Sequence, residues 1–342
     1  MSLSNPIVTC FVATILFLAY ISDAVGASDD VVQAAHKEGG LLIYGSGSLD
    51  DVQTWIKHFS NRYPSINAKY HRQGRTAVYE RIIRENRAGL FAADVYVVAG
   101  MQAWLLAKNG FLSQYISSER AAVQKELQDR DGYWTAAYTN SYVTAYNLKQ
   151  VPPQDVPRSY EDLLLPKWKG KMGFRDDDYE WYATVLEFMG REKGLQYIRR
   201  LAQQQIKFAG DSPLRIQLLC AGEYSLDIGI HFDHPENARK KGCPVNWVVL
   251  EPGYKRPPIA IALAKSPPHP SAARIFIDWM LSRDGQKVVT DFTNREPVRA
   301  DVELGAGVQK LKQFRFWKSN WDSIFLNLDE HQKAYRELFG LK

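Results

Sequence analysis

Residues 175–182 read RDDDYEWY, so one arginine and three consecutive aspartates stand directly before a stretch with three aromatic residues. Clustered carboxylates could hold a metal ion or transfer protons, but acidic residues are also typical of a helix start. Asp177 or Asp178 stands where an N-cap residue belongs, and Glu180 follows Asp177 by three residues, as in a capping box. Capping explains most of this acidity, but a ligand site stays open because helix N-termini in α/β proteins commonly face the ligand crevice.

A second candidate site is HFDHPEN at residues 231–237, which offers His231, Asp233, His234 and Glu236. Imidazole and carboxylate groups are the ligands that many protein-bound metals take. The spacing matches no strong metal motif, however, and His234-Pro235 is equally typical of a turn into a helix. The sequence therefore leaves a metal site and a plain turn as alternatives.

The third candidate is the loop Gly45-Ser46-Gly47-Ser48, which follows a predicted strand and precedes a predicted helix. Backbone N–H groups and hydroxyls at such a place can hold an anion or another polar ligand. The loop lacks the third glycine of a dinucleotide fingerprint and the Gly-Lys-Ser/Thr of a P-loop, and it is not Gly-x-Ser-x-Gly. A ligand loop and a plain tight turn both remain, and no catalytic triad can be assembled from spacing alone.

The elements that must position these residues alternate between strands and helices. The pattern predicts strands near 41–45, 67–72 and 93–98, with amphipathic helices over 50–64 and 77–89 between them. This β-α-β-α-β order indicates an α/β layer with a mostly parallel sheet. Residues 133–147 are aromatic and β-branched, which predicts an extended segment long enough to cross between two lobes. A helix with one apolar stripe follows from residue 179.

The amino-acid composition limits the classes of function that the chain can have. The 342 residues are 45% hydrophobic and 24% charged, which is typical of a globular protein. Lys and Arg number 43 against 38 Asp and Glu, and the longest basic cluster, ARKKG at 238–242, is too short for a nucleic-acid stripe. We therefore expect no nucleic-acid partner.

The N-terminus predicts export. An apolar run from Ile7 to Ile21 is followed by the small residues Val25-Gly26-Ala27, the pattern of a cleaved secretory signal, with an uncleaved membrane anchor as the alternative. We predict a mature chain that begins near Ser28. Two cysteines then remain, Cys220 and Cys243. We expect them to lie close in space, as a disulfide or as two buried free thiols.

Four segments carry a family resemblance: YEDLLLPKWKGKMGF, CAGEYSLDI, KGCPVNWVVLEP and above all HPSAARIFIDWMLSRDGQ at 269–286. In this order they resemble the extracellular solute-binding proteins of bacterial ABC importers, most closely the iron(III)-type branch with the type 2 periplasmic-binding fold. The resemblance covers essentially the whole mature chain. It implies two α/β lobes, each a mixed, mostly parallel sheet flanked by helices, joined by crossing strands. We expect a signal peptide at 1–27, a first lobe of 28–137 plus 255–296, and a second lobe of 138–254 plus 297–342.

The resemblance also implies a ligand cleft between the lobes. It is expected to be lined by the loop after the first strand, the end of the ADVYVVAG strand, the crossing segment and a helix N-terminus of the second lobe. These positions are Ser46, Ser48, Ala99, Gly100, Tyr138, Asn140, Asp176, Asp178, Tyr179 and Trp181.

The chain departs from the iron binders at one place. Those proteins carry two adjacent tyrosines that ligate Fe(III), whereas Phe232 and Asp233 stand there in this sequence. Phenylalanine cannot ligate a metal. His231, Asp233 and Tyr138 could form a different metal site, and an organic ligand held by Ser, Tyr, Trp and Arg groups is an equal alternative.

The predicted function is therefore a periplasmic binding protein that captures a small solute, organic or ferric, and delivers it to an inner-membrane ABC permease. We expect a monomer without a cofactor and without catalytic activity. The alternatives are an exported enzyme on the same two-lobed scaffold, and a ligand-presenting protein that docks to a receptor.

Overall fold

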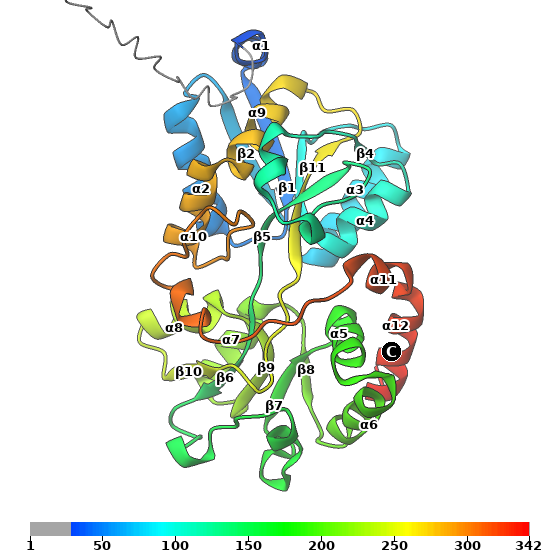
Figure 1. Ribbon diagram of the computed structural model, residues 1–342, viewed down its shortest axis with the longest axis vertical. Helices are drawn as coiled ribbons and strands as arrows, with labels where there is room; N and C mark the ends of the chain where they lie inside the picture. Colours follow the sequence, from blue (N-terminus) through cyan, green and yellow to red (C-terminus); the bar gives the residue numbers. More distant parts are fainter. Residues whose placement is uncertain (1–28, 342) are drawn as a thin grey trace, which may run out of the picture.

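The first sheet forms where the sequence alternates strands and helices (Figure 1). The computed structural model describes residues 29–341. Its first sheet consists of β1 (Gly40–Gly45), β2 (Asn67–Arg72), β3 (Val95–Ala99), β4 (Leu112–Ser113), β5 (Trp134–Thr139) and β11 (Pro258–Ala264). The strand order is β2-β1-β3-β11-β4, with β5 also paired to β11. β1 is parallel to β2 and β3, while β11 is antiparallel to its three neighbours.

Amphipathic helices cover this sheet because each has one apolar stripe to bury. They are α1 (Asp29–Glu38), α2 (Leu49–Arg62), α3 (Arg75–Arg87), α4 (Gly100–Lys108), α9 (Pro270–Leu281) and α10 (Arg283–Thr293). In α2 the side chains of Val52, Trp55 and Phe59 are buried, which confirms most of the predicted stripe. Phe59 packs edge-on against Phe276 of α9, with 5.1 Å between ring centroids. The segment that most clearly carries the family resemblance is therefore a core helix of this first lobe.

The second sheet has the strand order β10-β6-β9-β7-β8. Its strands are β6 (Tyr142–Asn147), β7 (Met172–Arg175), β8 (Lys207–Ala209), β9 (Leu226–His231) and β10 (Val245–Val248). β7 is parallel to β8 and β9, while β6 is antiparallel to β9 and β10. Both sheets are thus mixed, and the antiparallel pairings involve β5, β6, β10 and β11, the strands next to the points where the chain passes between lobes.

Helices flank the second sheet on both sides (Figure 1). They are α5 (Tyr179–Met189), α6 (Arg191–Ala202), α7 (Ser212–Ala221), α8 (Asp233–Lys240) and α12 (Leu328–Phe339). The short helix α11 (Trp321–Leu326) lies between the lobes beside α4, where Phe325 faces Trp104 with 6.2 Å between ring centroids. Short 3₁₀ segments occur at Ser118–Ala122, Lys125–Leu127, Pro153–Asp155, Glu161–Leu164, Pro166–Trp168 and Val308–Leu311. The C-terminal helix α12 packs against α5 and α6, and Tyr335 meets Tyr179 edge-on at 5.5 Å. The last residues of the chain therefore complete the second lobe.

Three crossing segments join the lobes. β5 and β6 form one of them, which confirms the extended crossing predicted for residues 133–147. The amide of Asn140 donates to the carbonyl of Pro257 at 3.1 Å, and that of Thr139 donates to Glu296 at 3.0 Å. The outgoing segment is thus hydrogen-bonded to both returning segments.

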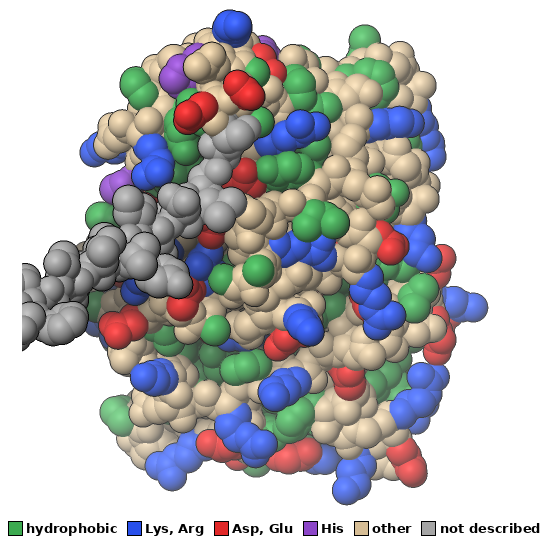
Figure 2. Space-filling model, turned by 45° about the horizontal axis from the view of Figure 1, so that its top comes forward, with side chains coloured by type: hydrophobic (Ala, Val, Ile, Leu, Met, Phe, Trp, Pro, Cys, Tyr) green, Lys and Arg blue, Asp and Glu red, His purple; other side chains and the backbone are tan. Residues whose placement is uncertain are grey.

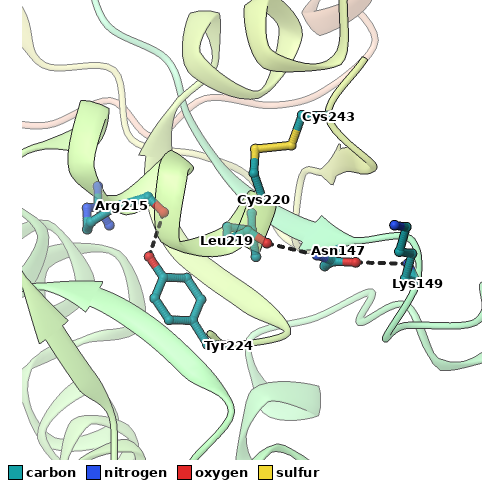
Figure 3. Close-up of a disulfide and its surroundings, with 7 residues drawn as sticks. All are labelled: Asn147, Lys149, Arg215, Leu219, Cys220, Tyr224 and Cys243. Carbon is teal, nitrogen blue, oxygen red and sulfur yellow. Dashed lines mark hydrogen bonds between the residues drawn. A yellow bond between two sulfur atoms is a disulfide. The ribbon is translucent and has the colours of Figure 1, made fainter. Parts of the chain in front are cut away.

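A disulfide joins α7 to the loop before β10 (Figure 3). The Cα atoms of Cys220 and Cys243 lie 5.7 Å apart, which confirms the predicted proximity and decides against two free thiols. The side-chain amide of Asn147 donates to the carbonyl of Leu219 at 2.8 Å, so the end of α7 is also tied to the end of β6. Both links fix the C-terminal half of α7 on the second sheet.

The predicted signal peptide lies outside the described residues. Within residues 29–341, no helix is long and apolar enough to span a bilayer. On the face drawn in Figure 2, acidic and basic side chains are interspersed. That face therefore presents no stripe of a single charge.

Candidate ligand cleft

A cavity of about 90 Å³ lies between the two lobes. It is built where strands end: β1, β2 and β3 lead into it from the first lobe, and β7, β8 and β9 from the second. This is the usual place for a ligand in α/β proteins, outside the carboxyl ends of the strands. The polar residues that line it are Ser46, Ser48, Arg72, Arg75, Tyr138, Asn140, Tyr142, Arg175, Glu180, Asp211, Ser212, His231, His234 and Arg295.

Three helix N-termini of the first lobe reach this cavity. Ser48, Gly74 and Ala99 are the N-cap residues of α2, α3 and α4, and none of these caps makes a side-chain hydrogen bond to its helix. The first N–H groups of a helix have no partner within the helix, and the helix dipole places partial positive charge there. The first-lobe wall therefore offers backbone donors to an anionic or polar ligand.

Four arginines add further donors. Arg72 and Arg75 come from the first lobe, Arg175 from the end of β7, and Arg295 from a crossing segment. Guanidinium groups are the side chains best suited to hold carboxylate or phosphate oxygens in two-point contacts. These four arginines form the part of the cavity wall with the most specific chemistry.

Carboxylates behind the wall orient the guanidinium groups. Arg295 is 4% exposed and donates to Asp51 of α2 at 2.9 Å and to Asp233 of α8 at 2.6 Å. Burial lowers the pKa of Arg295, but the two carboxylates outweigh burial and raise it, so the group is charged. Asp51 and Asp233 do not line the cavity themselves. They hold Arg295 rigidly so that its remaining surface faces the cleft.

Two more arginine–carboxylate pairs occur at the cleft. Arg175 is buried and pairs with Asp177 two residues later. Arg75 of α3 donates to Glu180 of α5 at 3.2 Å, so this pair joins the two lobes across the cavity. Burial raises the pKa of Asp177, but Arg175 and Arg75 outweigh it and hold that pKa below its usual value.

Half of the predicted cleft residues line the cavity. These are Ser46, Ser48, Ala99, Tyr138 and Asn140. Gly100, the first residue of α4, does not line the cavity. Its Cα lies so close to Pro258 that a Cβ atom on it would be 2.7 Å from the proline side chain.

The predicted residues of the acidic stretch lie elsewhere. Asp178 points into the protein, where it caps α5 by accepting from the amide of Trp181 at 3.0 Å and pairs with the buried Lys255. Trp181 packs on Phe174 at 4.8 Å, Tyr179 packs on α12, and Asp176 is exposed. Helix capping is therefore the structural role of this stretch.

One acidic member of the stretch, Glu180, does reach the cleft, and sequence reasoning missed it. Glu180 was expected to close a capping box, but Asp178 is the N-cap and Glu180 turns to Arg75 instead. The four arginines were missed as well, although Arg72 ends a predicted strand and Arg175 opens the quoted motif. A basic residue at the carboxyl end of a strand was the available signal.

Three of the candidate metal ligands lie together, since one ligand atom each of His231, Asp233 and His234 lies within 4.8 Å of the others. Tyr138 lines the same cavity as the two histidines. Burial lowers the pKa of both histidines, and Arg295 adds to that effect, so their rings are neutral. Asp233, however, already accepts from Arg295, whose fixed positive charge opposes a cation at the same carboxylate.

At the position where the resemblance implies two tyrosines, the described chain has Phe232 and Asp233. Phe232 is 2% exposed and packs edge-on against Trp247 at 5.0 Å, so it belongs to the core. Burial raises the pKa of the phenols of Tyr138 and Tyr142, so both side chains are protonated and neutral. The cavity wall therefore combines four guanidinium groups with the carboxylates of Glu180 and Asp211.

Comparison with known proteins decides the family. The sequence model described as bacterial extracellular solute-binding protein matches residues 104–324. The chain belongs to this family. It is a substrate-binding protein of an ABC importer and holds a small solute between its lobes. Proteins of this family work with an ABC permease.

Its relatives bind different solutes. The chain is 23% identical over 267 residues to the Fe(3+)-binding periplasmic protein of Serratia marcescens, covering 75% of this chain and 78% of that one. The fold matches a ferric binding protein from Campylobacter jejuni with a TM-score of 0.73 and 21% identity, over 87% of this chain and 99% of the other. It also matches the periplasmic binding protein AfuA from Actinobacillus pleuropneumoniae, with fructose-6-phosphate bound, with a TM-score of 0.76 and 19% identity, over 89% and 99%.

Proposed function

We propose that the solute is a small organic anion, such as a compound with a phosphate, phosphonate or carboxylate group. The observation that carries this proposal is the convergence of four arginines and three helix N-termini without side-chain caps on one cavity. Each offers positive charge or N–H donors, and together they match oxygen-rich anions.

Ferric iron is the competing solute, and the similar proteins include binders of both kinds. The choice therefore rests on the cleft. By the family resemblance, Phe232 stands where the iron binders carry a tyrosine, and its ring packs against Trp247. Arg295 holds Asp233. Both features support an organic anion over Fe(III).

The finer properties of the protein belong to the same proposal. We infer export to the periplasm with removal of residues 1–27, a monomeric protein, and release of the solute to an inner-membrane permease without turnover. Ser46, Ser48, Ala99, Tyr138 and Asn140 are proposed to contact the solute, because they line the cavity. The lobe boundaries given above remain predictions.

A ligand panel tests the proposal. Protein freed of solute by unfolding and refolding is mixed with phosphonates, phosphate esters, carboxylates, glucose and ferric citrate, and its melting temperature is followed. A solute that binds only the folded state adds about 2.7 kcal/mol at a hundredfold excess over Kd. We expect stabilisation by organic anions alone. A visible tyrosinate-to-iron band that disappears in Tyr138→Phe would contradict this result.

Substitution of Arg72 gives a matched test. Arg72 is exposed, lines the cavity and donates to the carbonyl of Gly47 at 3.1 Å. The substitution Arg72→Gln therefore leaves no buried carboxylate without its partner. We expect affinity for the stabilising anion to fall about tenfold, since a hydrogen bond to a charged group contributes roughly 1.5–3 kcal/mol. Arg84→Gln on the exposed side of α3 is the control and should leave affinity unchanged.

A further inference from the structure

Glu180 is a buried acceptor in a wall of donors. Its side chain is 3% exposed and lines the cavity from the first turn of α5. Oε2 accepts from Arg75 at 3.2 Å, whereas Oε1 has no hydrogen-bond partner among residues 29–341. A buried polar atom without a partner costs about 1–3 kcal/mol, and more if it is charged. The atom is therefore expected to find a partner in the cleft.

Neighbouring donors are already engaged. The ammonium of Lys255 pairs with Asp178, and the hydroxyl of Tyr142 lies 3.0 Å from Nε2 of His231. The other acidic residue on the cavity wall, Asp211, caps α7 by accepting from the amide of Leu214 at 3.2 Å. Asp211 is exposed, whereas Glu180 is buried, so among the described residues Glu180 is the acidic group of the wall that holds a partnerless oxygen away from solvent.

The charge balance of the cleft also favours a solute that carries a hydrogen-bond donor. The four arginines of the wall are matched by five carboxylates, two on the wall and three behind it: Glu180, Asp211, Asp51, Asp177 and Asp233. Such a cleft has no large excess of positive charge. It suits an anion that carries its own donor better than a bare multiply charged anion.

We propose that Oε1 of Glu180 accepts a hydrogen bond from an ammonium or hydroxyl group of the solute, so the solute is a small anion with such a donor a few bonds from its acidic group. This inference rests on the proposed function. The arginines and helix N-termini hold the acidic group, and Glu180 selects the donor at the other end.

Two matched ligand series test the role of Glu180. The first is 2-aminoethylphosphonate, 2-hydroxyethylphosphonate and ethylphosphonate; the second is 3-aminopropanoate, 3-hydroxypropanoate and propanoate. Binding to solute-free protein is measured by titration calorimetry. In at least one series we expect the ammonium or hydroxyl compound to bind at least tenfold more tightly than the compound without a donor. Whichever donor binds more tightly identifies the solute class.

Glu180→Gln is the decisive variant, because it keeps the shape of the side chain and an oxygen for Arg75. We expect it to weaken binding of the donor-bearing compound at least tenfold and to leave the donor-free compound unchanged. Glu187→Gln is the same change two turns further along α5 at an exposed position, and it should alter neither. Melting temperatures without ligand verify that both variants fold.

The remaining outcomes overturn the inference in distinguishable ways. Equal binding of all members of a series would show an anion site in which Glu180 selects nothing, and the proposed function would stand. Equal losses for donor-bearing and donor-free compounds in Glu180→Gln would reduce Glu180 to a support for Arg75. Failure of every compound in both series would overturn the organic-anion proposal together with this one.

Discussion

At the residue scale, Arg295 is the most connected side chain of the cleft. One guanidinium contacts Asp51 of the first lobe, Asp233 of the second, and Asn140 of the crossing segment at 2.7 Å. A buried charge that loses one partner is strongly destabilising. Arg295 thus couples the relative position of the lobes to the geometry of the cavity wall.

Asp51 gives this network a pH dependence. Burial raises the pKa of Asp51 to about 6, against the opposing effect of Arg295. Between about pH 4 and pH 6 the folded protein therefore holds a proton that the unfolded chain releases. The free energy of unfolding should fall as pH rises through this window and become constant above it, by an amount on the order of 1 kcal/mol or more.

Denaturant unfolding at pH 4.5 and pH 7 of the wild type and Asp51→Asn measures this effect. The variant keeps a hydrogen-bonding side chain, and Arg295 keeps Asp233. We expect the free energy of unfolding to decrease more between the two pH values in the wild type than in Asp51→Asn. Parallel changes in the two proteins would show that Asp51 titrates normally.

At the element scale, the disulfide holds α7, whose N-terminus contributes Ser212 to the cleft. The two cysteines are separated by 23 positions, and closing a loop of that length stabilises a protein by about 3 kcal/mol. The double variant Cys220→Ser/Cys243→Ser should lose about 2–4 kcal/mol of unfolding free energy. Its ligand affinity should change little, because Asn147 still holds the end of α7.

Chemical denaturation of the oxidised protein and the double variant checks this expectation, with the wild type under reducing conditions as a second comparison. A large loss of ligand affinity in the double variant, despite an intact fold, would show that the bridge positions α7 for binding.

The sequence predicts elements better than side-chain directions. The apolar stripe of α2, the crossing at 133–147 and the family fold follow from periodicity and motif. The direction of each acidic side chain at the start of α5 does not. Asp178 turns inward because Lys255 lies there, 77 positions away in sequence, and Glu180 turns to Arg75 across the cleft. Partners so distant in sequence leave no local pattern.

At the scale of the whole molecule, the cleft depends on both lobes at once. Arg75 with Glu180 and Arg295 with its two aspartates bridge the lobes at the cavity. Release of a solute from a cavity of about 90 Å³ requires these contacts to part. Ion pairs thus stabilise the arrangement of lobes described here.

Export is the remaining prediction at this scale. Removal of residues 1–27 would leave α1 intact, because α1 begins at Asp29 and packs against α9. We expect mass spectrometry of protein secreted by a bacterial host to give a chain that starts near Ser28, by the spacing of Val25-Gly26-Ala27 after the apolar run. An intact Met1 end on the exported protein would contradict the assignment of a cleaved signal.

The position of β11 determines the order in which the two sheets can be finished during synthesis. β11 lies between β3 and β4 in the first sheet, yet it begins only at Pro258. All strands of the second sheet lie between residues 142 and 248. The ribosome thus delivers every strand of the second sheet before the strand that completes the first. The sheet that starts first is therefore finished last, and until then β3 has one unpaired edge, the kind of exposed edge to which chaperones bind.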